Sequence, residues 1–121
     1  MASILAVDDS PSIRLMLERT LVDAGFEVTT AVDGKDGLAK ARQGKFNVVL
    51  TDINMPEMDG FELIKALRQL ANYRFTPILT VTTESAEQQK HRGRAAGATG
   101  WIVKPFEPRQ LLAVVHKVLG R

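Results

Sequence analysis

The residues best suited to chemistry stand at or just after the ends of short apolar stretches: Asp8, Asp9, Asp52, Thr82 and Lys104. Three carboxylates drawn together in a partly dry crevice repel one another, and leaving them uncompensated is costly. A hard divalent cation removes that cost, and Mg²⁺ prefers oxygen ligands in octahedral geometry. We therefore expect Mg²⁺ to be held by Asp8, Asp9 and Asp52.

The same set of residues has the parts that phosphoryl transfer needs. Asp52 ends the most apolar stretch of the chain, so it is the best candidate nucleophile. Lys104 offers a point charge for a phosphoryl oxygen, and Thr82 offers a hydroxyl donor to another. The chain has no Gly-rich phosphate loop of the Walker type, so bound ATP is not the expected phosphoryl donor.

The elements that must position these residues follow from the apolar patterning. Short runs rich in β-branched residues predict five strands, at 4–7, 28–31, 46–51, 77–82 and 101–103. Helices are expected between the strands: one from Pro11 to Gly25, one that ends near Gly44, one that follows Gly60, one over 84–96, and a last one that begins around Pro108. Asp33-Gly34 is interpreted as a turn. The first helix should bury Ile13, Leu17, Leu21 and Ala24, and the last one Leu111, Leu112, Val115 and Leu119.

Repeated alternation of strand and helix predicts an α/β fold with a doubly wound parallel sheet and helices on both faces. No linker or repeat interrupts the pattern, so residues 1–121 are expected to form a single domain. In such a sheet, ligands bind beyond the carboxyl ends of the strands, which is where the candidate residues fall.

Composition narrows the functional classes. The chain has 121 residues, 45% hydrophobic and 25% charged, with no Cys, which predicts an ordinary soluble globular protein of the cytoplasm. No stretch is apolar enough for a membrane span. Residues 1–60 carry 6 basic and 10 acidic side chains, and residues 61–121 carry 10 and 4. No single helix concentrates the basic ones, so nucleic-acid binding is not expected.

At these spacings, Asp8-Asp9, Asp52, Thr82 and Lys104-Pro105 resemble the receiver domain of bacterial response regulators. The tract 52–60 (DINMPEMDG) matches the loop of that family closely, and the resemblance covers essentially the whole chain. Within the family it is most similar to the stand-alone chemotaxis regulators. The resemblance implies a flavodoxin-like, five-stranded sheet in the order 2-1-3-4-5.

The resemblance also implies roles for individual residues. Asp52 is expected to be the phosphoacceptor and Mg²⁺ to be bound by Asp9 and Asp52 directly, by Asp8 mostly through water, and by the backbone carbonyl of Asn54. Thr82 is expected to move toward the phosphoryl group and Lys104 to pair with it. The bond from Lys104 to the following proline is expected to be cis.

The implied activity is that of a signalling receiver and not of an enzyme acting on other substrates. It would catalyse its own phosphorylation and slow autodephosphorylation. The partners would be a histidine kinase or histidine phosphotransfer protein and a downstream target, such as a flagellar motor switch. A cytoplasmic monomer is expected. The output surface would include Thr82, Trp101, Lys90 and Arg94.

Two positions depart from the family pattern, and one helix is unusual. Trp101 stands where the family has Tyr or Phe, and it is either a moving switch or fixed core packing. Thr83 is bulkier than the small residue usual there and would narrow access to the phosphoryl group. The helix over 84–96 has almost no apolar stripe and contains Gly93, which predicts low local stability.

Other interpretations remain. Each Asp alone could be a turn or capping residue, and Thr82 could be a simple strand-end residue. The chain could be a phosphorelay shuttle or phosphate sink, a phosphohydrolase of small molecules, or an unphosphorylated scaffold. Asn54 weakens the hydrolase alternative, because it stands two positions after Asp52, where a general acid would be needed. The complete set of site residues weakens the scaffold alternative.

Overall fold

The computed structural model describes residues 2–120; Met1 and Arg121, which the expected domain 1–121 includes, lie outside the described residues. Five strands alternate with helices along the chain. The strands are β1 (Ser3–Val7), β2 (Glu27–Ala31), β3 (Val48–Thr51), β4 (Ile78–Thr82) and β5 (Gly100–Val103). The helices are α1 (Pro11–Asp23), α2 (Gly34–Gln43), α3 (Gly60–Arg68), α4 (Glu87–Ala96) and α5 (Pro108–Val118), with a 3₁₀ turn η1 (Ala71–Tyr73).

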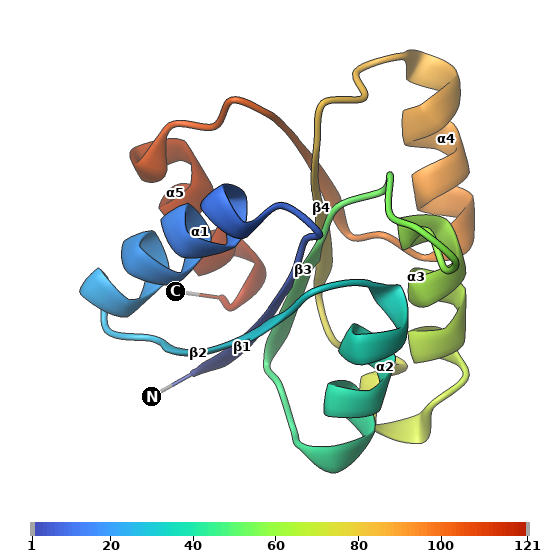
Figure 1. Cartoon of the computed structure of the whole chain (residues 1–121), viewed down its shortest axis with the longest axis horizontal. Helices are drawn as coiled ribbons and strands as arrows, with labels where there is room; N and C mark the ends of the chain where they lie inside the picture. The colour runs from blue at the N-terminus through green and yellow to red at the C-terminus, as the bar shows by residue number, and fades with distance from the viewer. Residues whose placement is uncertain (1, 121) are drawn as a thin grey trace.

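The strands form one parallel sheet in the order β2-β1-β3-β4-β5. Helices α1 and α5 cover one face, and α2, α3 and α4 cover the other (Figure 1). The predicted fold class and strand order are therefore confirmed. The loops that follow β1 and β3 lie at the upper end of the sheet in Figure 1, and the connection from α2 to β3 lies at the lower end.

Burial explains why β3 and β4 occupy the middle of the sheet. Every residue of β3 and of β4 is buried, because helices cover both faces of these strands. Such continuous apolar runs are typical of central parallel strands. The two faces make separate cores. Leu17 and Leu21 of α1 pack with Leu111 of α5 on one side, and Ile64 of α3 packs with Leu38 of α2 on the other.

Polar side chains fix the starts of α1, α2 and α3. Ser10 caps α1 by accepting a hydrogen bond from the Ile13 backbone N–H, and Pro11 follows at the first helical position. The expectation that Asp33-Gly34 is a simple turn is wrong. Asp33 is the cap of α2 and accepts from the Asp36 N–H at 2.8 Å, and Gly34 is already helical.

Two predicted boundaries move inward. The third strand was expected from residue 46 but starts at Val48, where Asn47 makes two bonds to Ser3: its side chain accepts from the Ser3 N–H and its own N–H donates to the Ser3 carbonyl. The fourth helix was expected from Glu84 but starts at Glu87. The backbone of Glu84 instead bonds to the side chains of Thr82 and Trp101.

The predicted core is slightly too large. Ala24 is exposed because it caps the end of α1, and Leu112 and Leu119 are only half-buried on the flanks of α5. The other residues expected in these two helix cores face inward, with Ile13 half-buried. Over residues 2–120, no helix has the length and apolar character needed to cross a membrane.

The amino end of the sheet is held by Arg68 and Tyr73, neither of which stood out in the sequence. The guanidinium of Arg68 donates to the carbonyls of Tyr73 and Thr76, both at 2.6 Å, and to that of Gly97 at 2.7 Å. The Tyr73 hydroxyl lies 2.6 Å from the Ala41 carbonyl oxygen. These bonds tie the connection from α3 to β4 to its neighbours.

Candidate functional site

Strand register creates the candidate site. Val7 of β1 is paired with Thr51 of β3, so the next residue in each strand, Asp8 and Asp52, emerges at the same edge. The Asp52 N–H continues the ladder by donating to the Val7 carbonyl at 3.0 Å. Because the strands are parallel, their carboxyl ends share that edge.

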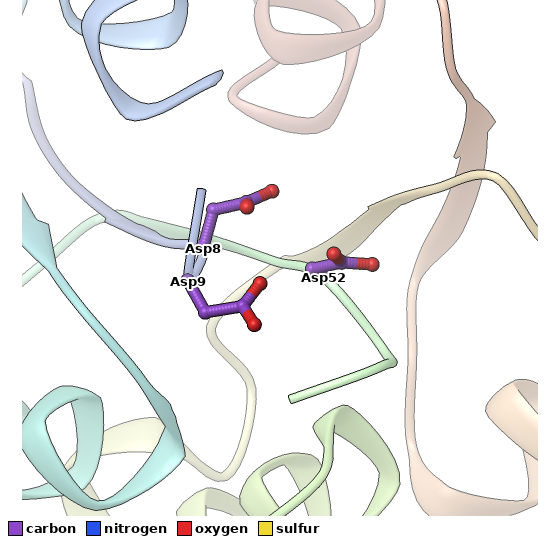
Figure 2. A group of neighbouring side chains, drawn as sticks. All are labelled: Asp8, Asp9 and Asp52. Carbon is purple, nitrogen blue, oxygen red and sulfur yellow. The ribbon is translucent and has the colours of Figure 1, made fainter. Parts of the chain in front are cut away.

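The three carboxylates predicted to bind metal do gather there. One oxygen from each of Asp8, Asp9 and Asp52 lies within 4.8 Å of the others, and Figure 2 shows the side chains side by side at the ends of β1 and β3. Asp8 and Asp52 are buried, and Asp9 is exposed. An all-oxygen acidic set with one open side fits Mg²⁺, which keeps several of its waters.

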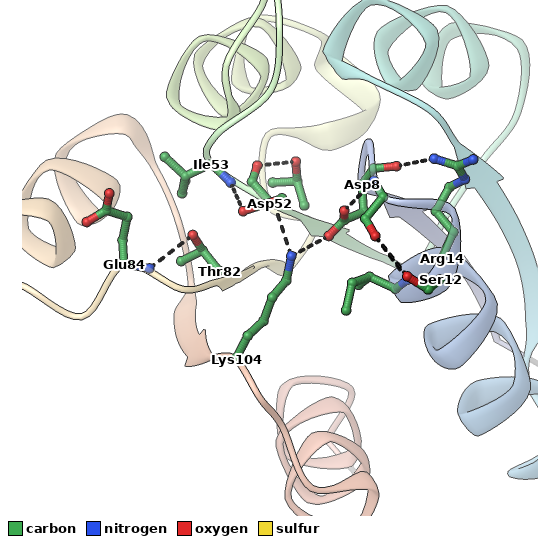
Figure 3. A network of polar contacts seen from close by, with 11 residues as sticks. Asp8, Ser12, Arg14, Asp52, Ile53, Thr82, Glu84 and Lys104 are labelled. Atoms are coloured by element: carbon green, nitrogen blue, oxygen red, sulfur yellow. Dashed lines mark hydrogen bonds and ion pairs between the residues drawn. The ribbon is translucent and has the colours of Figure 1, made fainter.

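Lys104 joins the two buried carboxylates. Its Nζ lies 2.7 Å from Asp8 Oδ2 and 3.1 Å from Asp52 Oδ2, reaching between them from the end of β5 (Figure 3). The Lys104 N–H donates to the Thr82 carbonyl at 2.8 Å, which extends the pairing of β4 with β5. The peptide bond from Lys104 to Pro105 is cis, as predicted.

Burial and charge act in opposite directions on this network. Burial raises the pKa of Asp8 above its ordinary value, although hydrogen bonds from Lys104 and the Ser10 N–H oppose the rise. Burial works to lower the pKa of Lys104, but its hydrogen bond to Asp8 and the charge of Asp52 outweigh that effect and leave it raised. The site therefore carries one ammonium among three carboxyl groups.

The backbone orients the Asp52 carboxylate. The Ile53 N–H donates to Oδ1 at 2.7 Å, while Lys104 donates to Oδ2. The Thr51 hydroxyl donates to the Asp52 carbonyl at 2.8 Å, which fixes the main chain at the same point. A carboxylate can accept about four hydrogen bonds. Each oxygen therefore keeps lone-pair capacity for a metal or an electrophile.

Thr82 and Trp101 are linked through the backbone of Glu84. The Glu84 N–H donates to the buried Thr82 hydroxyl at 3.3 Å, and the Trp101 indole N–H donates to the Glu84 carbonyl at 2.8 Å. Figure 3 shows Thr82 and Glu84 beside the Lys104 network. Because Thr82 only accepts in this contact, its hydroxyl proton stays available to another acceptor at the edge.

Gly93 makes room for the Trp101 ring. A Cβ atom added at Gly93 would come within 2.6 Å of Trp101 Cζ3, closer than carbon atoms approach. The indole ring also stacks on the Phe61 ring, with their centroids 6.4 Å apart. The Arg92 guanidinium lies over the Phe61 ring, 4.2 Å from its centroid. The glycine that weakens α4 as a helix is therefore the residue that lets it pack on a tryptophan.

The remaining candidate residues lie partly at this edge and partly on α4. Asn54 is exposed in the loop two residues after Asp52, and Thr83 is exposed at the end of β4. Lys90 and Arg94 lie on α4 and, with Trp101, line a small cavity of about 80 Å³. Trp101, Lys90 and Arg94 thus share one surface, whereas Thr82, the fourth expected output residue, is buried beside the Lys104 network.

Sequence reasoning missed Arg14 as a neighbour of the site. Its guanidinium donates to the Asp8 carbonyl at 2.7 Å, one helical turn beyond the Ser10 cap. The Ser10 N–H donates to Asp8 Oδ1 at 2.9 Å. The start of α1 therefore positions Asp8. The spacing between Ser10 and Arg14 in the sequence is the signal that could have indicated that Arg14 lies beside Asp8.

Comparison with known proteins agrees with this geometry. Residues 4–116 match the model of the response regulator receiver domain. The protein PilH of Pseudomonas aeruginosa is 40% identical over 120 residues, covering 99% of both chains. The solved chemotaxis protein CheY4 of Vibrio cholerae is 55% identical with a TM-score of 0.95, covering 98% of both.

A third similarity bears on the carboxylates. The receiver domain of the sensor histidine kinase PA1611 of Pseudomonas aeruginosa has a TM-score of 0.92 at 26% identity, covering 99% of this chain and 98% of that one. That structure holds a magnesium ion in its active-site cleft. Other curated relatives are longer, and the chain spans only 48% of the transcriptional regulator PhoP of Bacillus subtilis.

Proposed function

The chain belongs to the response regulator receiver domain family, and from that premise we propose that it accepts a phosphoryl group from a phosphohistidine on Asp52. The observation that carries the proposal is the position of Lys104 Nζ, within 3.1 Å of the Asp52 carboxylate and 2.7 Å of that of Asp8. A cation shared by two buried carboxylates marks the place where the added charge of a phosphoryl group is compensated.

The transfer itself is a displacement at phosphorus. An oxygen of the Asp52 carboxylate forms the new O–P bond, the N–P bond of the donor phosphohistidine breaks, and the imidazole nitrogen keeps the electron pair. The Ile53 N–H holds Oδ1 in place during the attack. Lys104 then pairs with a phosphoryl oxygen, and Thr82 turns its free hydroxyl proton toward another.

Asp8, Asp9 and Asp52 would hold Mg²⁺, with Asn54 supplying its backbone carbonyl. When bound, the ion neutralises charge on the transferring phosphoryl oxygens. The burial of Asp8 supports this assignment, because a carboxylate taken out of water needs positive charge beside it; burial raises its pKa even though Lys104 donates to it. Divalent metal and Lys104 together balance the carboxylates.

The output would be a change at the surface formed by Trp101, Lys90 and Arg94. Motion of Thr82 toward a phosphoryl group breaks its contact with the Glu84 N–H, and Glu84 also holds the Trp101 indole. The chain 1–121 would act as a single receiver domain whose signal leaves by binding a target protein. The similarity to CheY4 favours a chemotaxis component as that target.

The test is incubation with acetyl phosphate and Mg²⁺ followed by intact-protein mass spectrometry. Wild type should gain one phosphoryl group, and Asp52→Asn should gain none. Asp59→Asn is the matched control, because Asp59 only caps α3 and should leave phosphorylation unchanged. Modification of the Asp52→Asn protein, or none in wild type, would refute the proposal.

Trp101 fluorescence tests the output step. Phosphorylation should change the emission of wild type, because the indole loses its Glu84 partner. Gly93→Ala should change the emission before any phosphodonor is added, since the new methyl group displaces the ring. An unchanged spectrum on phosphorylation, with mass spectrometry showing a modified Asp52, would mean that Trp101 is fixed core packing.

A further inference from the structure

The amino end of the sheet carries an open groove that the proposed phosphotransfer does not use. It has a volume of about 430 Å³ and lies between the connection from α2 to β3 and the connection from α3 to β4. We call it the amino-end groove, and it is lined among others by Lys45, Phe46, Asn47, Asn72, Phe75 and Thr76. It shares no residue with the carboxylate edge.

Phe75 is the most unusual residue of this groove. Its side chain is 90% exposed, far more than any other large hydrophobic side chain in the described part of the chain. Burial of a phenyl ring is favourable, and an apolar patch rimmed by polar side chains is typical of an interaction site. Phe46 adds a second, half-buried ring to the same groove.

The backbone under Phe75 is held firmly. Arg68 donates to the carbonyl groups of Tyr73, Arg74 and Thr76, which flank Phe75 on both sides. The Tyr73 hydroxyl also donates to the carbonyls of Ala41 and Gly44 at the end of α2. A backbone that is fixed before binding loses little conformational freedom on docking, so Phe75 is exposed on an ordered segment.

The charge around the groove has one sign. Lys45 lines it, Arg42 lines an adjoining cavity of about 180 Å³, and Arg74 precedes Phe75. Neither cavity has an Asp or Glu among its lining residues. Within residues 2–120, none of these three basic side chains forms an ion pair. Unpaired cations around an aromatic anchor complement an acidic partner.

We propose that the amino-end groove docks an extended acidic peptide segment of a partner protein. An apolar side chain of that segment packs on Phe75, and its carboxylates face Lys45 and Arg42. A protein segment fits better than a nucleic acid because the basic residues are few and form no stripe. Since the groove lies at the opposite end of the sheet from Asp52, docking is independent of phosphorylation and would serve to localise the receiver.

The experiment titrates ¹⁵N-labelled full-length protein with a short synthetic peptide in which glutamates flank one phenylalanine, followed by NMR. Amide signals of residues 42–47 and 71–76 should shift. Phe75→Ser and Lys45→Glu should each weaken binding by about tenfold or more, as expected for the anchors of an interface. Asp52→Asn should bind as wild type does.

Matched controls keep the result specific. Val22→Ser removes an exposed apolar side chain from α1, and Lys117→Glu reverses an exposed charge on α5, so neither should change affinity. Because Phe75 is exposed, its replacement should preserve the fold, which circular dichroism checks. If that variant does unfold, Lys45→Glu still decides the matter.

Three outcomes would overturn the proposal. The first is the absence of any shift up to about 1 mM peptide, which would leave less affinity than a weak specific contact needs. The second is equal binding of a peptide with lysines in place of glutamates. The third is self-association on sedimentation that Phe75→Ser abolishes, since the occupant would then be a second copy. None of these outcomes depends on whether Asp52 is phosphorylated.

Discussion

The two ends of the sheet both hold partly buried charged or polar side chains, but the hydrogen-bond partners of these side chains differ. At the amino end, Arg68 and Tyr73 give their hydrogen bonds to backbone carbonyls. At the carboxyl end, Lys104 is shared between Asp8 and Asp52, and Asp9 forms no ion pair with any residue in 2–120. The hydrogen-bonding groups of Arg68 and Tyr73 are satisfied by the fold, whereas the carboxylates at the other end keep capacity to bind a ligand.

The pKa shifts record the same difference. Burial lowers the pKa of Arg68 and raises that of Tyr73, and neither group has a charged partner to titrate with. Asp8 and Lys104 influence one another instead. Buried polar groups that are fully satisfied make a structure rigid, whereas partly satisfied charges are typical of functional sites. Arg68 and Tyr73 therefore act as structural groups, whereas the arrangement of Asp8 and Lys104 is typical of a functional site.

The largest effect should come from Arg68. Arg68→Met removes the donor to several carbonyls at once, and hydrogen bonds from a charged donor are the strong ones, so we expect a loss of about 3 kcal/mol in unfolding free energy. Urea denaturation measures it. Added Mg²⁺ should stabilise this variant only as much as wild type; a larger increment would show that the two ends are coupled.

Lys104→Met should cost about 2 kcal/mol in metal-free buffer, because two buried carboxylates lose their counter-charge. Here the metal matters. Mg²⁺ should add more stability to the Lys104→Met variant than to wild type, because the ion replaces the missing ammonium group. Denaturation with chelator and with Mg²⁺ makes the comparison, and an increment equal to that of wild type would contradict the proposed metal site.

Asp8→Asn should stabilise the metal-free protein by about 1 kcal/mol at neutral pH and weaken Mg²⁺ binding. The folded pKa of Asp8 is raised, so the folded state holds this proton more tightly than the unfolded chain does. Wild type therefore loses stability as pH rises through the range between the unfolded and the folded pKa of Asp8. The advantage of the variant should shrink as pH is lowered through the same range. A constant difference across acidic and neutral pH would refute this account.

The smallest effect concerns the backbone near the site. Glu57 has φ of 65°, a left-handed conformation that few side chains favour, in the loop between β3 and α3. Glu57→Asn should stabilise the protein by about 0.5 kcal/mol, because Asn tolerates this conformation better. Lys35→Gln removes the exposed ion pair with Glu57 and serves as the control for that lost contact. A loss of stability in the Asn variant smaller than that of the control would mean that the ion pair outweighs the strain, and a loss as large as that of the control would mean that Asn relieves no strain.

Local patterning was enough to predict most of the fold. Strand–helix alternation indicated a parallel sheet, and the apolar run before Asp52 marked its central strand, because only a strand covered on both faces is apolar throughout. The meeting of the candidate site residues was also predictable. Parallel strands end at one edge, so Asp8, Asp52 and Lys104 had to meet there once the register was aligned.

Tertiary structure alone decided the contacts between residues far apart in sequence. Arg68 looked like an ordinary basic residue near a helix end, and its carbonyl partners come from the α3–β4 connection and from Gly97. Gly93 looked like a helix breaker until Trp101 was found against it. Periodicity reports which face of an element is buried, but the partner across that face depends on packing between elements, which no single stretch of sequence contains.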